Sequence, residues 1–522
     1  PNTPSASSKV RVSDASDATV NDLSNLNFSI KGSVTLTAPN SGEVWVVGAV
    51  QNITWNVFGA IANVKLQYST DGGLTWPVGN LITASTPAST DPPLGVDNGQ
   101  YSWTIPDVIG AQLRVRASDA ADATVFDDSN ANFAIKGSLT VTAPNGGQVW
   151  IVGAAQTITW TKTGSFANVK LEYSRNGFTD ELQTVVITAS TPNTLSFAWT
   201  IPDAIGTTLK VRASDAADAT VVDVSDATFT IKGSLTLTAP NGTEVWRVGE
   251  SRNLTWTKTG TIATVKLEYS TDGGTTFPNV ITASTDATTG TYAWTVPNAI
   301  GASVRVRITT TADATVLDDS NANFEIKGSV TLTAPNGPEV WVVASAQNLT
   351  WTRTGSIANV KLEYSTNAFA NELQTTVITA STAADPLPTD NAGTYAWTVP
   401  DAIGTSLRVR ITNTVDAAVV DTSDANFKIT GSVTLTAPNG DPDGAGPLTA
   451  ESWTVGSAQN VTWTKVGSIA NVKLEYSTDG GTTFPSIIVA STAAATGAFA
   501  WPIPDAIFST VRVTISDTAD ST

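Results

Sequence analysis

Aspartate residues gather in a segment that recurs along the chain. The two densest groups consist of Asp119, Asp122, Asp127 and Asp128 and of Asp215, Asp218, Asp223 and Asp226. Clustered carboxylates are the hard oxygen ligands that calcium prefers. Neither group has the Asp-X-Asp-X-Asp-Gly spacing of an EF-hand loop, and Asp, Ser and Asn are also ordinary turn residues. Two interpretations therefore stay open, a calcium site near a domain joint and a solvated turn.

Aromatic and acidic residues offer two further chemistries. The 16 tryptophans could stack on sugars, but most alternate with Ile or Val within extended segments, which favours core packing. Trp76 occurs in one copy only and is the candidate exposed aromatic. One position holds Glu172, Glu268, Glu363 and Glu475, and Gln67 in the first copy. A glycosidase needs two converging carboxyls, so this outward position is interpreted as a solvated face.

Possible glycosylation sites lie in a third pattern. Asn-X-Thr sequences begin at Asn52, Asn253, Asn348 and Asn460. Such sequences are acceptors for N-linked glycans, but each lies inside an expected strand, where a glycan would be awkward. Exposed Ser and Thr could also carry O-linked sugars.

Composition excludes several classes of function. The chain of 522 residues has no Cys, His or Met, and 28 basic and 46 acidic residues give a net charge of −18. Disulfides, thiolate metal sites, imidazole ligands and a Ser-His-Asp triad are thereby excluded. The charge argues against nucleic acid and anionic membrane as partners. Apolar runs stay far below the ~20 residues of a membrane span. We therefore expect that the chain has no enzymatic activity and binds no cofactor other than calcium.

These residues belong to a unit that repeats five times. Gly-Ser-(Val/Leu)-Thr-(Leu/Val)-Thr-Ala-Pro-Asn begins at Gly32, Gly137, Gly233, Gly328 and Gly431. A period near 100 residues is too long for a solenoid unit and typical of a β-sandwich domain. Within a copy, apolar residues alternate, as in Val64, Leu66 and Tyr68, which predicts about seven short strands. Ser-Thr-Asp-Gly-Gly at Asp71 predicts a two-residue hairpin, and Phe178–Thr184 could hold a helical turn.

The composite motif resembles a known module. Its parts are Pro-Asn-Gly-Gly-X-Val-Trp, Ile-Thr-Trp, Val-Lys-Leu-X-Tyr-Ser, Tyr-X-Trp-Thr-X-Pro and Asp-X-Ser-X-X-X-Phe-X-Ile. It is similar to the Ig-like domain of the Ser/Thr-rich, GPI-anchored cell-wall proteins of fungi involved in β-glucan assembly. Similar modules occur as tandem repeats in secreted and surface proteins of bacteria. The resemblance implies an extracellular or cell-surface setting and carries over no catalytic residue.

Neighbouring copies join without a flexible linker. The last strand of one copy runs through Ile-Lys-Gly-Ser into the next, as between Ile135 and Leu139. Such short joints predict a stiff array.

The two ends of the sequence complement one another. Residues 1–32 align with residues 202–233, the last strands of a copy, while the fifth copy stops before its own final strand. Either the chain is a segment of a longer repetitive protein, which also fits Pro1 as first residue, or the orphan strand of one copy of the chain completes the open domain of the next. The residues expected at this contact are Leu26, Phe28 and Ile30 on the strand and Val511, Val513 and Ile515 on the open edge.

The sequence thus predicts an all-β tandem array of seven-stranded Ig-like or fibronectin-III-like sandwiches. The expected domains are 33–137, 138–233, 234–328, 329–431 and 432–522, preceded by strands of an incomplete domain at 1–32. The expected function is a structural stalk, fibre or filament outside the cell, whose partners are copies of itself head-to-tail or a surface polysaccharide. The alternative is an adhesin or carbohydrate-binding array that uses inserted loops such as 88–98.

Overall fold

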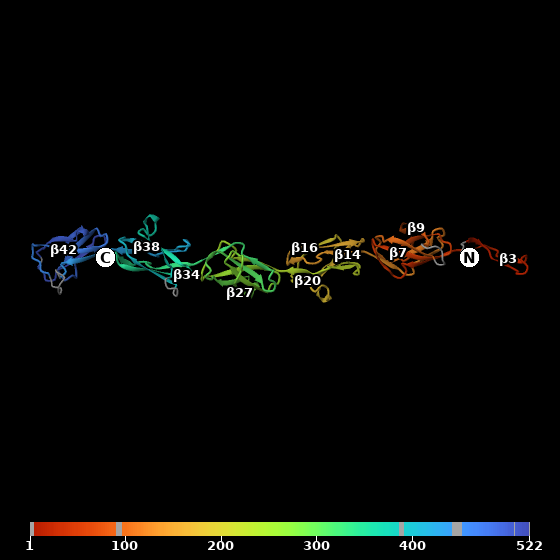
Figure 1. Cartoon of the computed structure of the whole chain (residues 1–522), viewed down its shortest axis with the longest axis horizontal. Coiled ribbons are helices and arrows are strands. Elements are labelled where there is room, and N and C mark those ends of the chain that lie inside the picture. The colour runs from red at the N-terminus through yellow and green to blue at the C-terminus, as the bar shows by residue number, and fades with distance from the viewer. Residues whose placement is uncertain (1–4, 90–96, 386–390, 441–450, 506, 521–522) are drawn as a thin grey trace. The chain divides into compact units, whose positions relative to one another are not determined.

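The computed structural model describes residues 5–89, 97–385, 391–440, 451–505 and 507–520. These residues form strands joined by turns and five short 3-10 helices (Figure 1). The chain falls into two compact units, one of residues 1–234 and 258–262 and the other of residues 235–257 and 263–522. Each unit is described below by itself.

The second sandwich, in the first unit, shows the complete arrangement. Its elements are β14 (Ser138–Ala143), β15 (Val149–Ile151), β16 (Ala155–Thr163), β17 (Asn168–Ser174), η2 (Glu181–Gln183), β18 (Thr184–Pro192), β19 (Ser196–Thr200), β20 (Gly206–Asp215), β21 (Val222–Val224) and β22 (Phe229–Lys232). One sheet has the order β14-β16-β19. The other has the order β15-β22-β20-β17-β18, and β21 pairs with β20 at its side. All described pairs are antiparallel except β15 with β22.

The first, third and fourth sandwiches repeat this topology. The first has β5 (Ser33–Ala38), β6 (Val44–Val46), β7 (Val50–Phe58), β8 (Asn63–Ser69), η1 (Val78–Asn80), β9 (Leu81–Pro87), β10 (Asp97–Thr104), β11 (Gly110–Asp119), β12 (Phe126–Asp128) and β13 (Phe133–Lys136). The third has β23 (Ser234–Ala239), β24 (Val245–Arg247), β25 (Ser251–Thr259), β26 (Thr264–Ser270), β27 (Asn279–Asp286), η3 (Ala287–Thr289), β28 (Thr291–Thr295), β29 (Gly301–Thr310), β30 (Leu317–Asp319) and β31 (Phe324–Lys327). The fourth has β32 (Ser329–Ala334), β33 (Val340–Val342), β34 (Ala346–Thr354), β35 (Asn359–Ser365), η4 (Glu372–Gln374), β36 (Thr375–Ala383), β37 (Ala392–Thr398), β38 (Gly404–Asn413), β39 (Val420–Thr422) and β40 (Phe427–Thr430).

The predicted fold class is confirmed, and two short strands add to the predicted seven. β15 and its equivalents pair in parallel with the last strand of the copy, which lies about 80–90 residues further along. β21 and its equivalents form a hairpin with the end of the longest strand. The helical turn expected near Phe178–Thr184 is present as η2. The prediction of a two-residue hairpin at Asp71 is wrong, because residues 70–80 separate β8 from β9. Within this longer loop, the Asp71 carboxylate accepts a hydrogen bond from the Thr75 amide at 3.0 Å.

Aromatic residues from both sheets fill the core. The Trp150 ring lies 6.0 Å from the Trp199 ring and 5.1 Å from the Phe229 ring, in edge and tilted arrangements that aromatic pairs prefer. Trp160 is 2 % exposed and donates its Nε1 proton to Asn193 at 2.8 Å. The alternation within the strands therefore buries the apolar face, as the sequence indicates.

Residues 5–31 form strands without a core of their own. β1 (Ser5–Ser8) pairs with β4 (Phe28–Ile30), and β2 (Arg11–Ser13) pairs with β3 (Asn21–Leu23). Phe28 is 42 % exposed, whereas its equivalent Phe133 is 1 % exposed. The apolar pattern of a last strand is thus present without the sandwich that would bury it.

The fifth sandwich, in its described residues, lacks a strand of the kind that β4 resembles. Its elements are β41 (Ser432–Ala437), β42 (Ala458–Val466), β43 (Asn471–Ser477), β44 (Ser486–Ala493), η5 (Ala494–Thr496), β45 (Ala498–Pro502) and β46 (Arg512–Asp517). Its second sheet has the order β44-β43-β46, and no strand equivalent to β15 or β22 is described among residues 451–505 and 507–520. The sheet therefore has an open edge at β46.

A substitution at Gly393 tests how tightly the core of the fourth sandwich is packed. A methyl group at Gly393 would overlap the Trp351 indole, whereas one at Gly404 would make ordinary contact with Leu407 at 3.6 Å. We predict that Gly393→Ala destabilises the fourth sandwich by about 1–3 kcal/mol through overpacking. Faster hydrogen exchange in peptides from β34 and β37 would measure the loss. Gly404→Ala is the matched control, and an equal effect of both substitutions would contradict this explanation.

Candidate functional site

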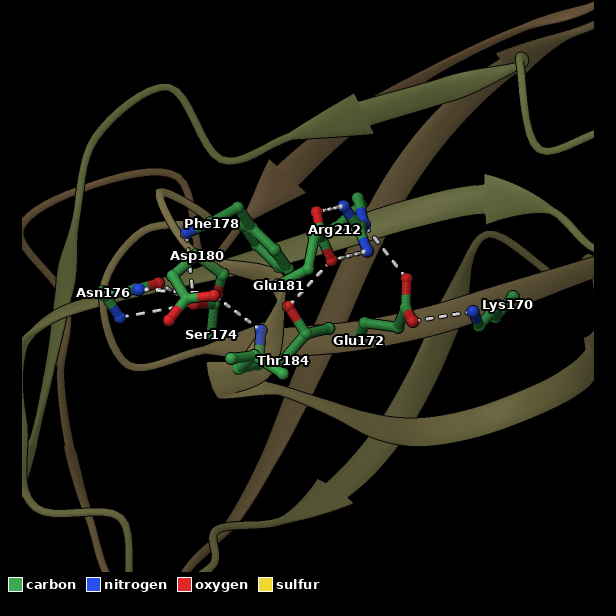
Figure 2. Close-up of polar contacts among 10 residues, drawn as sticks. Lys170, Glu172, Ser174, Asn176, Phe178, Asp180, Glu181, Thr184 and Arg212 are labelled. Carbon is green, nitrogen blue, oxygen red and sulfur yellow. Dashed lines mark hydrogen bonds and ion pairs between the residues drawn. The ribbon is translucent and has the colours of Figure 1, made fainter.

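A cluster of charged residues lies on the outer face of the larger sheet in the second sandwich (Figure 2). Arg212 of β20 donates to Glu172 of β17 at 3.0 Å and to both carboxylate oxygens of Glu181 at 2.7 and 3.0 Å. Lys170 pairs with the other oxygen of Glu172 at 2.7 Å. We call these residues, with the ring of Phe178, the arginine cluster.

The loop that follows β17 is held in place for this contact. The Ser174 hydroxyl accepts bonds from the Asn176 and Phe178 amides at 3.3 and 3.1 Å. Phe178 has a φ of 65°, an uncommon value for a bulky residue, and its ring lies 4.5 Å from the Arg212 guanidinium. Asp180 caps η2 by accepting from the Leu182 amide at 2.9 Å. These local hydrogen bonds therefore position Glu181 beside Arg212.

Charge pairing shifts the acid–base properties of the cluster. The hydrogen bond from Arg212 lowers the pKa of Glu181, and the bond to Glu181 in turn raises the pKa of Arg212. Glu172 is only 5 % exposed, so the predicted solvated face is wrong at this position. The residue does point away from the core, but Arg212 and the loop cover it.

The fourth copy builds the same cluster from the equivalent residues, and the third uses a different carboxylate. Arg410 pairs with Glu363 and Glu372 beneath Phe369. Arg307 pairs with Asp319 at 2.7 Å beneath Phe277. In the fifth copy Thr514 takes the arginine position. The shallow groove beside Arg410 has Lys361 and Glu363 among its lining residues, and these two are paired to each other. The cluster acts as a brace between loop and sheet.

Trp76 belongs to this brace in the first sandwich. The Arg116 guanidinium lies between the rings of Trp76 and Phe126, 4.3 and 4.0 Å from their centres, and pairs with Asp128 at 2.7 Å. Trp76 is half-buried, and its buried Nε1 has no hydrogen-bond partner. The prediction of an exposed aromatic is therefore wrong, because the arginine stacks on the ring. Most of the inserted loop at 88–98 lies outside the described residues.

The structure does not bring the candidate calcium ligands together. Asp119 accepts from the Ala121 amide, Asp127 from the Leu36 amide, and Asp128 pairs with Arg116. In the second copy, Asp215 accepts from the Ala217 amide, Asp223 from the Val141 amide, and Asp226 from Asn145. Within the described ranges, no group of three or more Asp and Glu side chains could hold a metal ion. Calcium binding stays a prediction that the geometry does not favour.

Asp122 and Asp218 have a different role, at the joints of the first unit. Lys136, the last residue of β13, pairs with Asp218 at 2.8 Å, and Lys31, just after β4, pairs with Asp122 at 2.7 Å. Hydrogen bonds from these lysines lower the pKa of each carboxyl to about 2. Ser165 also donates its amide proton to Asp107 at 3.0 Å. Within the second unit, Lys327 and Asp416 make the same kind of pair at 2.9 Å.

The residues expected at an assembly contact are accessible to different degrees. Leu26 is 82 % exposed and Ile30 is partly buried. On the open edge, Val511 is 38 % exposed, while its equivalent Leu113 is fully buried opposite Phe133. Val513 and Ile515 are also partly exposed. The assembly contact between these two sets of residues stays a prediction.

The chain is similar to several solved structures at low sequence identity. No family model and no curated protein matches the chain, so the resemblance to the fungal cell-wall family stays a prediction. The chain is similar to fibronectin(III)-like modules of CbhA from Clostridium thermocellum, with 20% identity, a TM-score of 0.14, and coverage of 38% of this chain and 94% of that one. It is also similar to the eight N-terminal Ig domains of Down Syndrome Cell Adhesion Molecule, with 8% identity, a TM-score of 0.21, and coverage of 95% and 71%.

A third similar structure is an alpha-2-macroglobulin of Escherichia coli, with 10% identity and a TM-score of 0.17. It covers 94% of this chain, which spans about half (52%) of that protein. Similarities this low carry no argument about function. In the described part of the chain, no helix is long and apolar enough to cross a membrane.

The arginine cluster leads to a stability prediction. Arg212→Ala removes one of the two cations paired with Glu172 and leaves its carboxylate paired with Lys170 alone, which we expect to cost about 1–3 kcal/mol of unfolding free energy. Adding Glu172→Gln should recover much of this loss, since Gln67 occupies the position in the first copy. Denaturant unfolding followed by hydrogen exchange in β17 and β20 would measure both. A double variant as unstable as the single one would contradict the role assigned to Glu172.

The Lys136–Asp218 pair predicts an acid-sensitive joint. The pKa of Asp218 falls from its ordinary value of 3.8 to about 2 in the folded chain. The stabilisation is therefore present above pH 3.8 and is lost as the pH falls through about 2. Hydrogen exchange at the end of β13 should accelerate over this interval. Asp218→Asn should raise exchange at neutral pH and remove that acid step, whereas an unchanged step would show that another group causes it.

Proposed function

We propose that the chain is a structural component outside the cell, a stalk or fibre of tandem Ig-like sandwiches that acts mechanically and not as an enzyme. Support comes from the direct passage of β13 into β14 and from the lysine–aspartate pair that accompanies it. A joint of one residue between two strands restricts bending far more than a Gly/Ser linker. A net charge of −18 favours the solubility of such an array.

One observation carries the finer proposal, that the array grows by strand addition. β4 has the sequence of a last strand but exposes Phe28, and β46 has the sequence of its pairing partner, with Val511, the residue just before it, also exposed. A following repeat or a second copy of the chain supplies a strand like β4 to this edge. In complete sandwiches Leu113 lies opposite Phe133, so the expected register places Phe28 opposite Val511. Strand addition of this kind satisfies backbone groups and fills the core together.

Polymerisation of the 522-residue chain tests the contact between copies. We expect head-to-tail polymers in electron micrographs and a concentration-dependent sedimentation coefficient. Phe28→Asp should weaken association about tenfold or more, because burying a phenylalanine contributes about 1.5–3 kcal/mol. Ser29 lies on the opposite face of β4, so Ser29→Asp is the matched control and should polymerise normally.

Two outcomes would overturn strand addition between copies. One is a wild-type chain that stays monomeric at every concentration. The other is a polymer in which Phe28→Asp and Ser29→Asp behave alike, since that would place the contact elsewhere. Protection of β46 amides in the polymer and not in the Phe28→Asp variant would confirm the edge.

A further inference from the structure

The outer face of the three-stranded sheet is used neither by the core nor by the arginine cluster. Its central strand carries Asn-X-Thr in four of the five copies, beginning at Asn52, Asn253, Asn348 and Asn460. The second copy has Thr157 at this position. We propose that these four asparagines are sites of N-linked glycosylation and that this face of the sandwich carries the glycans.

Exposure supports the proposal. All four asparagines are exposed, although each lies in the middle of a sheet. The residue that follows each of them is fully buried, as Ile53 and Leu254 show. Because side chains alternate along a strand, the asparagine points to solvent. A position within a strand is therefore no obstacle, since a glycan on it would extend away from the core.

Small neighbours leave room around the site. Across the sheet, Asn253, Asn348 and Asn460 lie opposite Ala293, Ala396 and Ala500. On the other side, the pairing of β32 with β34 ends at Thr350, so no strand flanks Asn348 there. In the first copy, Ser102 lies opposite Asn52 and donates to its Oδ1 at 2.9 Å. Oδ1 is not the atom that would be modified.

The threonine of each sequence has a structural role that does not depend on glycosylation. The Thr54 hydroxyl bonds to that of Thr37 at 2.7 Å, and the equivalent pair in each other copy does the same. The second copy keeps this pair, as Thr142 and Thr159, without the asparagine. Every copy therefore presents the threonine, and the asparagine alone decides which copies can accept a glycan.

Two further Asn-X-Ser/Thr sequences lie outside this face. Asn241 precedes Gly-Thr, and its Oδ1 accepts from the Asn321 amide at 2.7 Å and so clamps a loop. Asn145 and Asn336 make the same clamp in copies that lack the motif. Asn241 is also only partly exposed, unlike the four outer-face asparagines, so the proposal excludes it. Asn27 precedes Phe-Ser and is exposed, so it gives no contrast.

The chemistry of the modification is a transfer to the amide nitrogen. Nδ2 of the asparagine forms a bond to the anomeric carbon of an oligosaccharide, while the bond from that carbon to the phosphate of a lipid-linked donor breaks. The phosphate leaves with the bonding electrons, and one amide proton passes to a base. The donor comes from the cell that exports the chain, and the protein supplies only the acceptor.

Glycopeptide mass spectrometry of the protein purified from its native source tests the proposal. We expect sugar on peptides that contain Asn52, Asn253, Asn348 or Asn460, and none on those that contain Asn241. Any occupied outer-face site with Asn241 unmodified supports the proposal. Four unmodified outer-face asparagines would overturn it, and so would sugar on Asn241, since the exposure argument would then fail to predict the sites.

A gain of function gives a second and independent test. Thr157→Asn completes the motif in the second copy, where Ala155 and Ala198 leave the same space. In the full chain secreted from a eukaryotic host, this variant should gain one glycan with an unchanged melting temperature. Asn253→Gln should lose one, and Asn241→Gln should lose none. A Thr157→Asn chain that stays unmodified while Asn253 is occupied would contradict the structural reasoning.

Discussion

Closure of the aromatic core by the last strand is the constraint on which the rest of each sandwich depends. β22 delivers Phe229 to the ring of Trp150, and it also pairs in parallel with β15, the strand that carries Trp150. Where no such strand is described, as in the fifth sandwich, Trp453 and Trp501 still meet at 6.1 Å. Val511 is then partly exposed, and residues 451–454 form no strand. One strand therefore completes both the hydrogen bonding and the packing.

The same strand also forms the joint to the next sandwich. β13 ends at Lys136 and β14 begins at Ser138, so the element that closes one core leads directly into the first strand of the next. Lys136 then pairs with Asp218 in a loop of that next sandwich. One strand both closes the core of a sandwich and forms the joint to the next. Local unfolding at the edge of the core therefore also loosens the joint, and the reverse.

The fold was predictable from the sequence because its signals are local or repeated. Alternation assigned Val64 and Leu66 to the core, and both are fully buried. The errors share one cause, since alternation gives the face of a strand but not what lies above it. Glu172 points outward and is covered by a loop whose course depends on Phe178 at positive φ. Trp76 is covered by Arg116, and the pairing of β15 with β22 spans a distance in sequence that no local pattern reports.

The two edges of the larger sheet differ in how well they could accept another strand. β18 and its equivalents lie at one edge, but the pairing to the neighbouring strand shifts register around Leu171 and Glu172, and it does so at the same place in every copy. Such irregularities bend and twist an edge and so oppose pairing from the side. The ladder between β43 and β46 has no shift, from Val472 opposite Asp517 to Ser477 opposite Arg512. The pairing of β46 is thus the more regular of the two, as the strand addition proposed above requires.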